Sequence, residues 1–86
     1  MKVAVVTGGS SGIGLAIIHQ LTAQGFKAIS WDINPPKEDV PFVRCDVTSE
    51  EAVKAALAQT HEQFGEPTIL INNCGLQFLS PVMNFH

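Results

Sequence analysis

A run of glycines near the amino terminus constrains the fold more than any other feature of this sequence. Residues 3–6 are apolar, residues 7–14 read TGGSSGIG, and a second apolar stretch begins at Leu15. Glycines allow a tight turn and let a following helix pack close to the strand before it. We therefore predict a buried strand, a glycine turn and a helix in direct succession.

The glycine turn is also a predicted binding site for an anion. The first N–H groups of the helix point toward the turn, and the helix dipole favours a negative charge there by about 0.3–1 kcal/mol. Such a site suits the pyrophosphate of a dinucleotide. The run is not a Walker loop, because Leu15 follows Gly14 where that loop has lysine, and its spacing differs from G-x-G-x-x-G. The glycines alone leave an ordinary strand-to-helix turn open as the alternative.

The first helix is predicted to follow the glycine turn over residues 11–24. Ile13, Ile17 and Leu21 recur every fourth residue, which puts them on one face, and we expect that face to pack on the sheet. Gly25 follows as a residue that can adopt the left-handed conformation that ends many helices.

A second helix is predicted further along the chain. We expect it to begin at Thr48, whose hydroxyl can cap the helix while Glu51 reaches back to the same end. Gly65 and Pro67 are expected to end it. Its predicted inner face carries Val53, Ala56, Leu57, Thr60 and Phe64.

Three further short segments have strand character. Residues 27–31 and 42–45 read as the second and third strands, and a proline-rich surface connection over residues 33–41 joins them. Residues 68–71 are an apolar, largely β-branched run that suits a buried parallel strand. The alternation predicts an α/β fold, the N-terminal half of a Rossmann-type doubly wound parallel sheet with strand order 3-2-1-4 and helices on opposite faces. The crevice between the first and fourth strands, where the order reverses, is the expected ligand site.

Two motifs together resemble the short-chain dehydrogenase/reductase family. The first is TGxxxGxG at residues 7–14, and the second is NNCG at residues 72–75, in which Cys74 stands where the family usually has alanine. The resemblance covers essentially the whole chain, but only the first part of the family's length. Residues 75–81 also look like the corresponding segment of 3-hydroxybutyrate dehydrogenases, with steroid, sugar or acyl-carrier substrates open as alternatives.

The fold and the resemblance imply a dinucleotide cofactor, and Asp32 bears on which one. Asp32 ends the second strand, eighteen residues past Gly14, where this fold has the acid that accepts hydrogen bonds from the adenosine ribose hydroxyls. Its carboxylate would repel a 2′-phosphate, and no Lys or Arg lies in the glycine turn or directly after Asp32. NAD is therefore expected over NADP, with a plain surface aspartate as the alternative.

The resemblance implies further contacts to the adenosine half of the cofactor. Asp46 and Val47 match the position at which the family contacts the adenine ring, although Asp46 can also start the following helix with a favourable charge. Asn72 and Asn73 bring amides to the mouth of the sheet, where they can tie adjacent strand ends together. The predicted cofactor-binding residues are Thr7, Gly8, Ser10, Ser11, Gly12, Ile13, Gly14, Asp32, Asp46, Val47, Asn72, Cys74 and Gly75.

Length and charge limit the other possibilities. The 86 residues suffice for one small domain, which we divide into a dinucleotide-binding half-domain, residues 1–75, and a tail, residues 76–86, that leads toward an absent catalytic half. A net charge of −3 without a basic patch argues against a nucleic-acid partner. The apolar run before the glycines is too short for a signal peptide core or a membrane span.

Cysteine and histidine usage fits a cytoplasmic protein without a metal site. Cys45 and Cys74 follow different strands, too far apart for a disulfide, and are expected to be reduced thiols. His19, His61 and His86 have no carboxylate or cysteine at ligand spacing, so we expect them on the surface.

The family's acid–base residues, a Ser and a Tyr followed four residues later by Lys, lie downstream of its second motif. This chain has no tyrosine and ends at His86, so we predict no catalytic residue in it. We expect the NAD-binding N-terminal portion of an enzyme that transfers hydride between NAD(H) and a small alcohol or ketone substrate. The alternatives are a free-standing, non-catalytic nucleotide-binding module and a fragment that only associates with other proteins. An open edge at residues 68–71 predicts a homo-oligomer.

Overall fold

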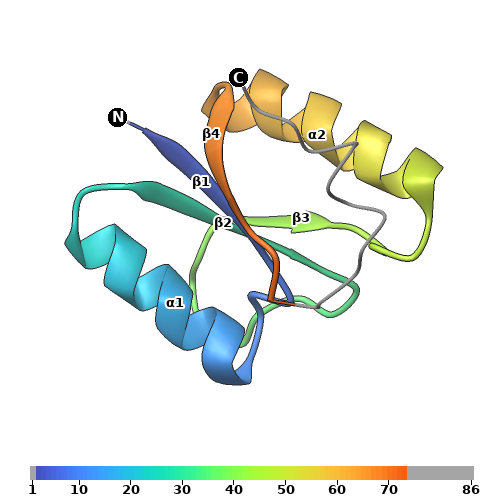
Figure 1. The fold of residues 1–86 in the computed structure, drawn as a ribbon. Helices are drawn as coiled ribbons and strands as arrows, with labels where there is room; N and C mark the ends of the chain where they lie inside the picture. The colour runs from blue at the N-terminus through green and yellow to red at the C-terminus, as the bar shows by residue number, and fades with distance from the viewer. Residues whose placement is uncertain (1, 74–86) are drawn as a thin grey trace.

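Four parallel strands and two helices make up the described part of the chain (Figure 1). The structure is a computed structural model and describes residues 2–73. The strand order β3-β2-β1-β4 confirms the predicted α/β fold and its topology. In chain order the elements are β1 (Val3–Thr7), α1 (Gly12–Ala23), β2 (Lys27–Asp32), β3 (Phe42–Arg44), α2 (Glu50–Phe64) and β4 (Pro67–Ile71).

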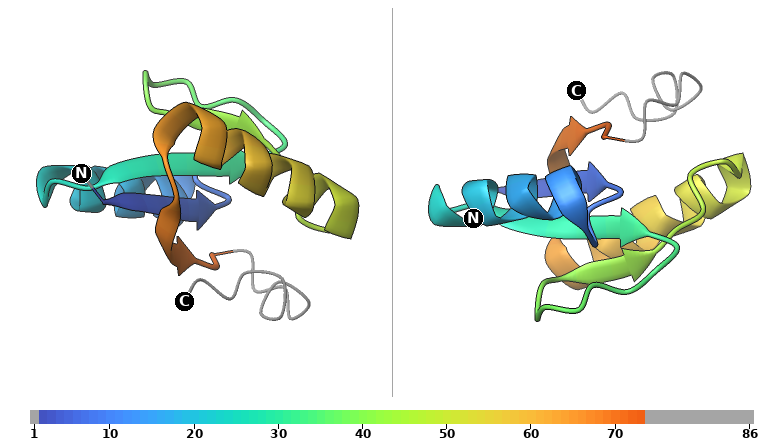
Figure 2. Two further views of the ribbon diagram at one scale, coloured as in Figure 1. Left: turned by 90° about the horizontal axis from the view of Figure 1, so that it is seen from above. Right: turned by 90° about the horizontal axis from the view of Figure 1, so that it is seen from below.

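Strand β1 lies at the centre of the sheet. It pairs in parallel with β2 on one side and with β4 on the other. Helix α1 covers one face of the sheet and α2 covers the other, as predicted (Figure 2). All five residues of β1 are buried, because a strand inside a parallel sheet has helices on both faces.

The larger core lies between the sheet and α2. Trp31 of β2 is fully buried in it, and its indole Nε1 donates a hydrogen bond to Oγ1 of Thr60 on α2 at 2.9 Å. The five residues predicted for the inner face of α2 are all buried or half-buried. A smaller core on the other face packs Ile18 of α1 against Val6 and Ala28 of the sheet. The periodicity of α2 therefore predicted its packing correctly.

The inner face of α1 differs from the prediction at one residue. Gly14 and Ile18 are buried, and Ile17 and Leu21 are half-buried beside them, whereas Ile13 is 74% exposed. The prediction that Ile13 packs on the sheet is wrong. In the first turn of α1 the buried residue is Gly14, which lies against the carbonyl group of Gly8, and the neighbouring side chain of Ile13 stays exposed on another side of the helix.

The start of α2 also differs from the prediction. Ser49 is the N-cap, and its hydroxyl accepts a hydrogen bond from the N–H of Ala52 at 3.2 Å. Thr48 cannot cap the helix because it lies one residue earlier, in a turn where its hydroxyl donates to Asp46 at 2.5 Å. Pro67 does not end α2 but begins β4, which is compatible with a proline at the first residue of a strand.

The pairing of β4 with β1 contains one shift in register. Val3 lies opposite Pro67 but Ala4 lies opposite Ile69, so the register passes over Thr68. Thr68 is exposed, and its hydroxyl donates to the carbonyl oxygen of Val3 at 3.4 Å. Beyond this shift the pairing is regular to the end of β4.

Candidate functional site

The glycine turn joins the carboxyl end of β1 to α1 (Figure 1). The N–H of Gly8 donates to the carbonyl oxygen of Trp31 at 2.8 Å and so fixes the start of the turn to β2. Gly12 has a φ of 57°, which residues with a side chain rarely adopt. Ser11 is the N-cap of α1, and its carbonyl oxygen accepts from the N–H of Leu15 at 3.2 Å. The unpaired N–H groups of the first turn of α1 therefore lie at the glycine turn.

Gly14 is the point of closest contact between α1 and the turn. A Cβ atom at this position would overlap the carbonyl oxygen of Gly8 and lie 2.7 Å from its carbonyl carbon. The same Cβ would lie 2.9 Å from Nδ2 of Asn73. The helix can therefore begin against the turn only because this residue lacks a side chain.

Asp32 holds the glycine turn from the end of β2. Its Oδ2 accepts from the N–H of Ser10 at 3.2 Å, and its Oδ1 accepts from the N–H of Asn34 at 3.2 Å. Ser10 is held a second time, because its hydroxyl lies 2.9 Å from that of Ser30 in the buried sheet. The carboxylate is half-buried, and each of its oxygens has a second lone pair that can accept from a ligand.

The second motif is tied to the first at the end of β1. The N–H of Asn73 donates to the hydroxyl of Thr7 at 2.9 Å, and that hydroxyl lies 3.3 Å from Oδ1 of Asn72. Nδ2 of Asn73 lies 3.5 Å from the carbonyl oxygen of Gly8. These contacts confirm that the asparagines tie adjacent strand ends together, and both asparagine side chains are exposed at this edge of the sheet.

A cavity of about 400 Å³ opens beside the glycine turn. One wall is the turn and the start of α1, and the other is the connection between β2 and β3. This cavity reveals Lys37, which the sequence interpretation did not assign to the site because it lies five residues past Asp32 in an irregular connection. The lining residues are Ser10, Ser11, Gly12, Leu15, Asn34, Pro35, Lys37 and Glu38.

Asp46 and Val47 follow β3 at the same edge of the sheet. The N–H of Cys45, directly before them, donates to the carbonyl oxygen of Asp32 at 3.0 Å. Asp46 is exposed, and its Oδ1 accepts from the hydroxyl of Thr48 at 2.5 Å and from the N–H of Thr48 at 3.0 Å. Those two hydrogen bonds favour the charged form and lower the pKa of Asp46. Val47 is half-buried against the larger core.

We expect the pKa of Asp46 to depend on the hydrogen bond that it accepts from the hydroxyl of Thr48. Replacing Thr48 with valine should move the pKa of Asp46 upward toward its ordinary value, because the hydroxyl donor is lost. A carboxyl group whose pKa is lowered in the folded state stabilises the fold above its unfolded pKa, and that contribution is lost as the pH falls through the folded pKa. NMR titration of the side-chain carboxyl carbon measures the shift.

The matched control for this titration is Thr22→Val. The hydroxyl of Thr22 donates only within α1, to the carbonyl oxygen of Ile18 at 2.8 Å, so this variant should leave the pKa of Asp46 unchanged. An unchanged pKa in Thr48→Val would contradict the assigned cause.

The remaining predicted residues divide into exposed, buried and undescribed ones. Within residues 2–73, no group of three or more His, Cys, Asp or Glu side chains could hold a metal ion, and no helix is long and apolar enough to cross a membrane. His19 and His61 are exposed, as predicted, and Cys45 is buried. Cys74, Gly75, and the tail over residues 76–86 with His86 lie outside the described residues.

A comparison with protein families gives one match over nearly the whole chain. The model of the short chain dehydrogenase family matches residues 2–86. Among curated relatives, the bovine (Bos taurus) protein 3-hydroxyacyl-CoA dehydrogenase type-2 is 37% identical over 93 aligned positions, which cover 95% of this chain and 35% of that protein. Short-chain dehydrogenase reductase 3a of Arabidopsis thaliana is 34% identical, over 87% of this chain and 33% of that protein. The chain thus spans about a third of the length of these relatives.

Solved structures with the same fold agree with this match. The ligand-free aldohexose dehydrogenase of Thermoplasma acidophilum superimposes with a TM-score of 0.78 at 38% identity, over 84% of this chain and 29% of that one. A short chain dehydrogenase from Leptospira borgpetersenii with bound NAD⁺ gives a TM-score of 0.72 at 26% identity, over 83% of this chain and 30% of that one.

Proposed function

The chain belongs to the short-chain dehydrogenase family, and we propose that it is the cofactor-binding part of an oxidoreductase that uses NAD. The observation that carries the choice of cofactor is the position of Asp32. Its carboxylate accepts from the N–H of Ser10 in the glycine turn and so lies where the adenosine ribose meets the turn in this fold. Two further observations agree with it: the bound NAD⁺ in the Leptospira relative, and a second carboxylate, Glu38, on the adjacent cavity wall.

The other residues at this edge fit the remaining parts of the cofactor. The glycine turn and the first N–H groups of α1 would hold the pyrophosphate. Asp46 and Val47 would contact the adenine ring, and Asn72 and Gly75 would line the ribose, with Cys74 as a small filler beside them. Exposed Ile13 would then cover the cofactor instead of the sheet, which accounts for an apolar side chain left in water.

The chemistry of the complete enzyme follows from the cofactor. When bound, NAD(H) supplies or accepts the hydride, and the substrate would be a small alcohol or ketone. The chain's own residues would bind and orient the adenosine half of the cofactor. The acid–base residues that the family uses lie beyond its second motif, so we assign none to the described residues. The open edge of β4 would pair with further sheet or with a second copy.

A binding measurement tests the proposal and the role of Asp32. We expect NAD to bind the chain measurably but weakly in calorimetry or NMR titration, with NADP weaker still. Replacing Asp32 with alanine should lower the ratio of the NAD affinity to the NADP affinity, because a charged hydrogen bond and a repulsion are both lost. The difference between the two binding free energies should change by about 1.5–3 kcal/mol at most.

Asp39→Ala is the matched control for this experiment. It removes the same charge from an exposed residue of the same connection that does not line the cavity, so the ratio should stay unchanged. Equal affinities of the unaltered chain for NAD and NADP would show the cofactor assignment to be wrong. No saturable response of the folded chain to millimolar NAD would leave only a role in protein association.

A further inference from the structure

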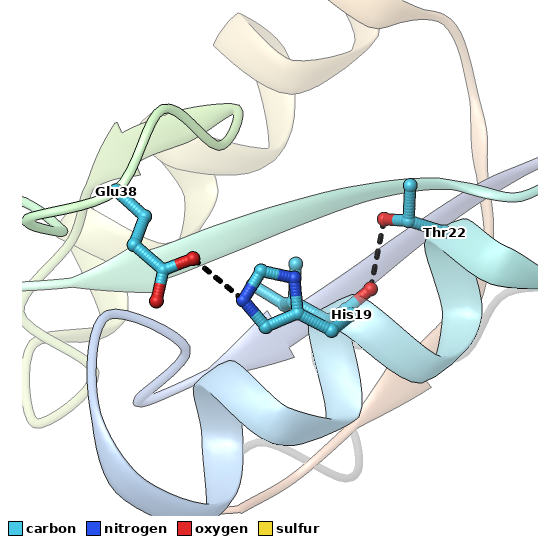
Figure 3. A network of polar contacts seen from close by, with 4 residues as sticks. His19, Thr22 and Glu38 are labelled. Atoms are coloured by element: carbon cyan, nitrogen blue, oxygen red, sulfur yellow. Dashed lines mark hydrogen bonds and ion pairs between the residues drawn. The ribbon is translucent and has the colours of Figure 1, made fainter.

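One contact between ionisable side chains joins α1 to the connection between β2 and β3. Nε2 of His19 lies 2.8 Å from Oε1 of Glu38, and Figure 3 shows the imidazole and the carboxylate directed at each other across the space between the two segments. Both side chains are about half exposed, at 52% and 54%. Glu38 also lines the cavity beside the glycine turn. The contact therefore joins the connection to the helix at the wall of the cavity.

The cavity borders the place where NAD and NADP differ. The carboxylate of Asp32 accepts from the N–H groups of Ser10 and Asn34, and both of those residues line the cavity. If the ribose hydroxyls bind Asp32, a 2′-phosphate would enter this cavity and meet Lys37 and Glu38 on its wall. Lys37 attracts such a phosphate and Glu38 repels it.

Few other ionisable residues lie on the elements around His19. Helix α1 has no Asp, Glu, Lys or Arg, and β1 has no ionisable side chain. The connection supplies Lys37, Asp39 and Glu38 itself. Lys27 begins β2 and lies over the ring of Phe64 of α2, and Asp32 ends β2. Protonation of His19 would change the charge beside the cavity from net negative to neutral, counting Asp32, Lys37, Glu38 and His19.

We propose that His19 is a specificity-determining residue, which acts through Glu38 to set how strongly the site rejects a 2′-phosphate. This inference rests on the proposed function, because it assumes that a dinucleotide occupies the turn. When His19 is protonated, the ion pair offsets the charge of Glu38 and holds it toward α1. When His19 is neutral, Glu38 faces the cavity with its full charge and NADP is rejected more strongly.

The test compares NAD⁺ and NADP⁺ binding at pH 6 and pH 8 in low salt, by NMR titration of the full chain. Relative to the unaltered chain, Glu38→Gln should raise the NADP to NAD affinity ratio by about two- to fivefold, the size of an exposed charge interaction. His19→Gln should lower that ratio more at pH 6 than at pH 8, because an imidazole carries more positive charge at the lower pH. His19→Lys keeps a positive charge at both pH values and should raise the ratio at pH 8 above that of the unaltered chain at the same pH.

The 2′-phosphate itself changes its charge with pH, but at one pH this charge is the same for every variant. Comparing variants at one pH therefore cancels its effect on the affinity ratio. The effect of His19→Gln at pH 6 should shrink in a Glu38→Gln background, which distinguishes action through Glu38 from a direct contact with the phosphate. His61→Gln and Glu62→Gln are matched controls on the exposed face of α2 and should leave the ratio unchanged.

The possible results separate the two proposals. Circular dichroism first verifies that each variant is folded. If the unaltered chain binds neither nucleotide, both the proposed function and this inference are overturned. If it binds them but the ratio is the same in all variants at both pH values, the inference alone is overturned. The inference would also be overturned if His19→Gln changed the ratio equally in the unaltered chain and in the Glu38→Gln background, because His19 would then act on the phosphate directly.

Discussion

Gly14→Ala should destabilise the fold and raise the dissociation constant for NAD by more than tenfold. The added Cβ would overlap the carbonyl oxygen of Gly8, a backbone atom that cannot rotate away, and would crowd the amide of Asn73. Overpacking of this kind costs about 1–3 kcal/mol or more. Alanine gains about 1 kcal/mol over glycine in a helix interior, which is too little to offset a clash with the backbone. Urea unfolding and NMR titration with NAD measure the two effects.

Gly25→Ala is the matched control for Gly14→Ala. Gly25 follows α1 at its other end with a φ of 93°, and a Cβ there would meet no atom within 4 Å. This variant should lose about 1–2 kcal/mol from backbone strain alone and keep the NAD affinity of the unaltered chain. A Gly14→Ala protein that unfolds at the same urea concentration as the unaltered chain would refute the close approach.

Trp31→Ala is expected to be the most destabilising side-chain substitution, at about 3–5 kcal/mol. Trp31 is the largest fully buried side chain and packs in the core between the sheet and α2. Because a small domain has a total stability of only about 5–15 kcal/mol, this variant can fail to fold. Trp31→Phe is the milder form: it keeps an aromatic ring but removes the N–H donor to the buried hydroxyl of Thr60.

A double-mutant cycle isolates that hydrogen bond. Trp31→Phe alone should cost about 1–3 kcal/mol beyond the loss of volume, because the hydroxyl of Thr60 loses its donor, and Trp31→Phe with Thr60→Val should recover part of it. Thr68→Val, which changes an exposed hydroxyl at the start of β4, should be nearly neutral. A coupling energy of zero between Trp31 and Thr60 in urea unfolding would contradict the contact.

The sequence predicted the fold well because the fold depends on short-range patterns. The apolar strands, the glycine turn and the periodicity of α2 each specify one element, and parallel strands with right-handed connections leave few ways to assemble them. The cap of α2 was predicted one residue early because Thr48 and Ser49 are both good caps. The choice between them depends on the turn that Asp46 makes with Thr48, which no local pattern reveals.

The candidate site was predictable to a lesser extent. The glycine turn, Asp32 and Asn73 follow from motifs, and the structure brings them to one edge of the sheet. The cavity wall formed by the connection between β2 and β3 could not be predicted from the sequence. Residues 33–41 are irregular, and their path depends on tertiary contacts such as that between His19 and Glu38. The exposure of Ile13 was likewise missed, since helical periodicity assumes that a helix meets the sheet along its whole length.

The register shift at Thr68 lies at the opposite end of the sheet from the two motifs. It lies where β4 begins, while both motifs lie where the strands end. If Thr68 were deleted, Pro67 and Ile69 could still face Val3 and Ala4, and no residue nearer the motifs would need a new neighbour. A change of one residue at this position would therefore be taken up at the amino end of β4. The distance between the two motifs in the folded sheet would therefore not change if this one residue were removed from the sequence between them.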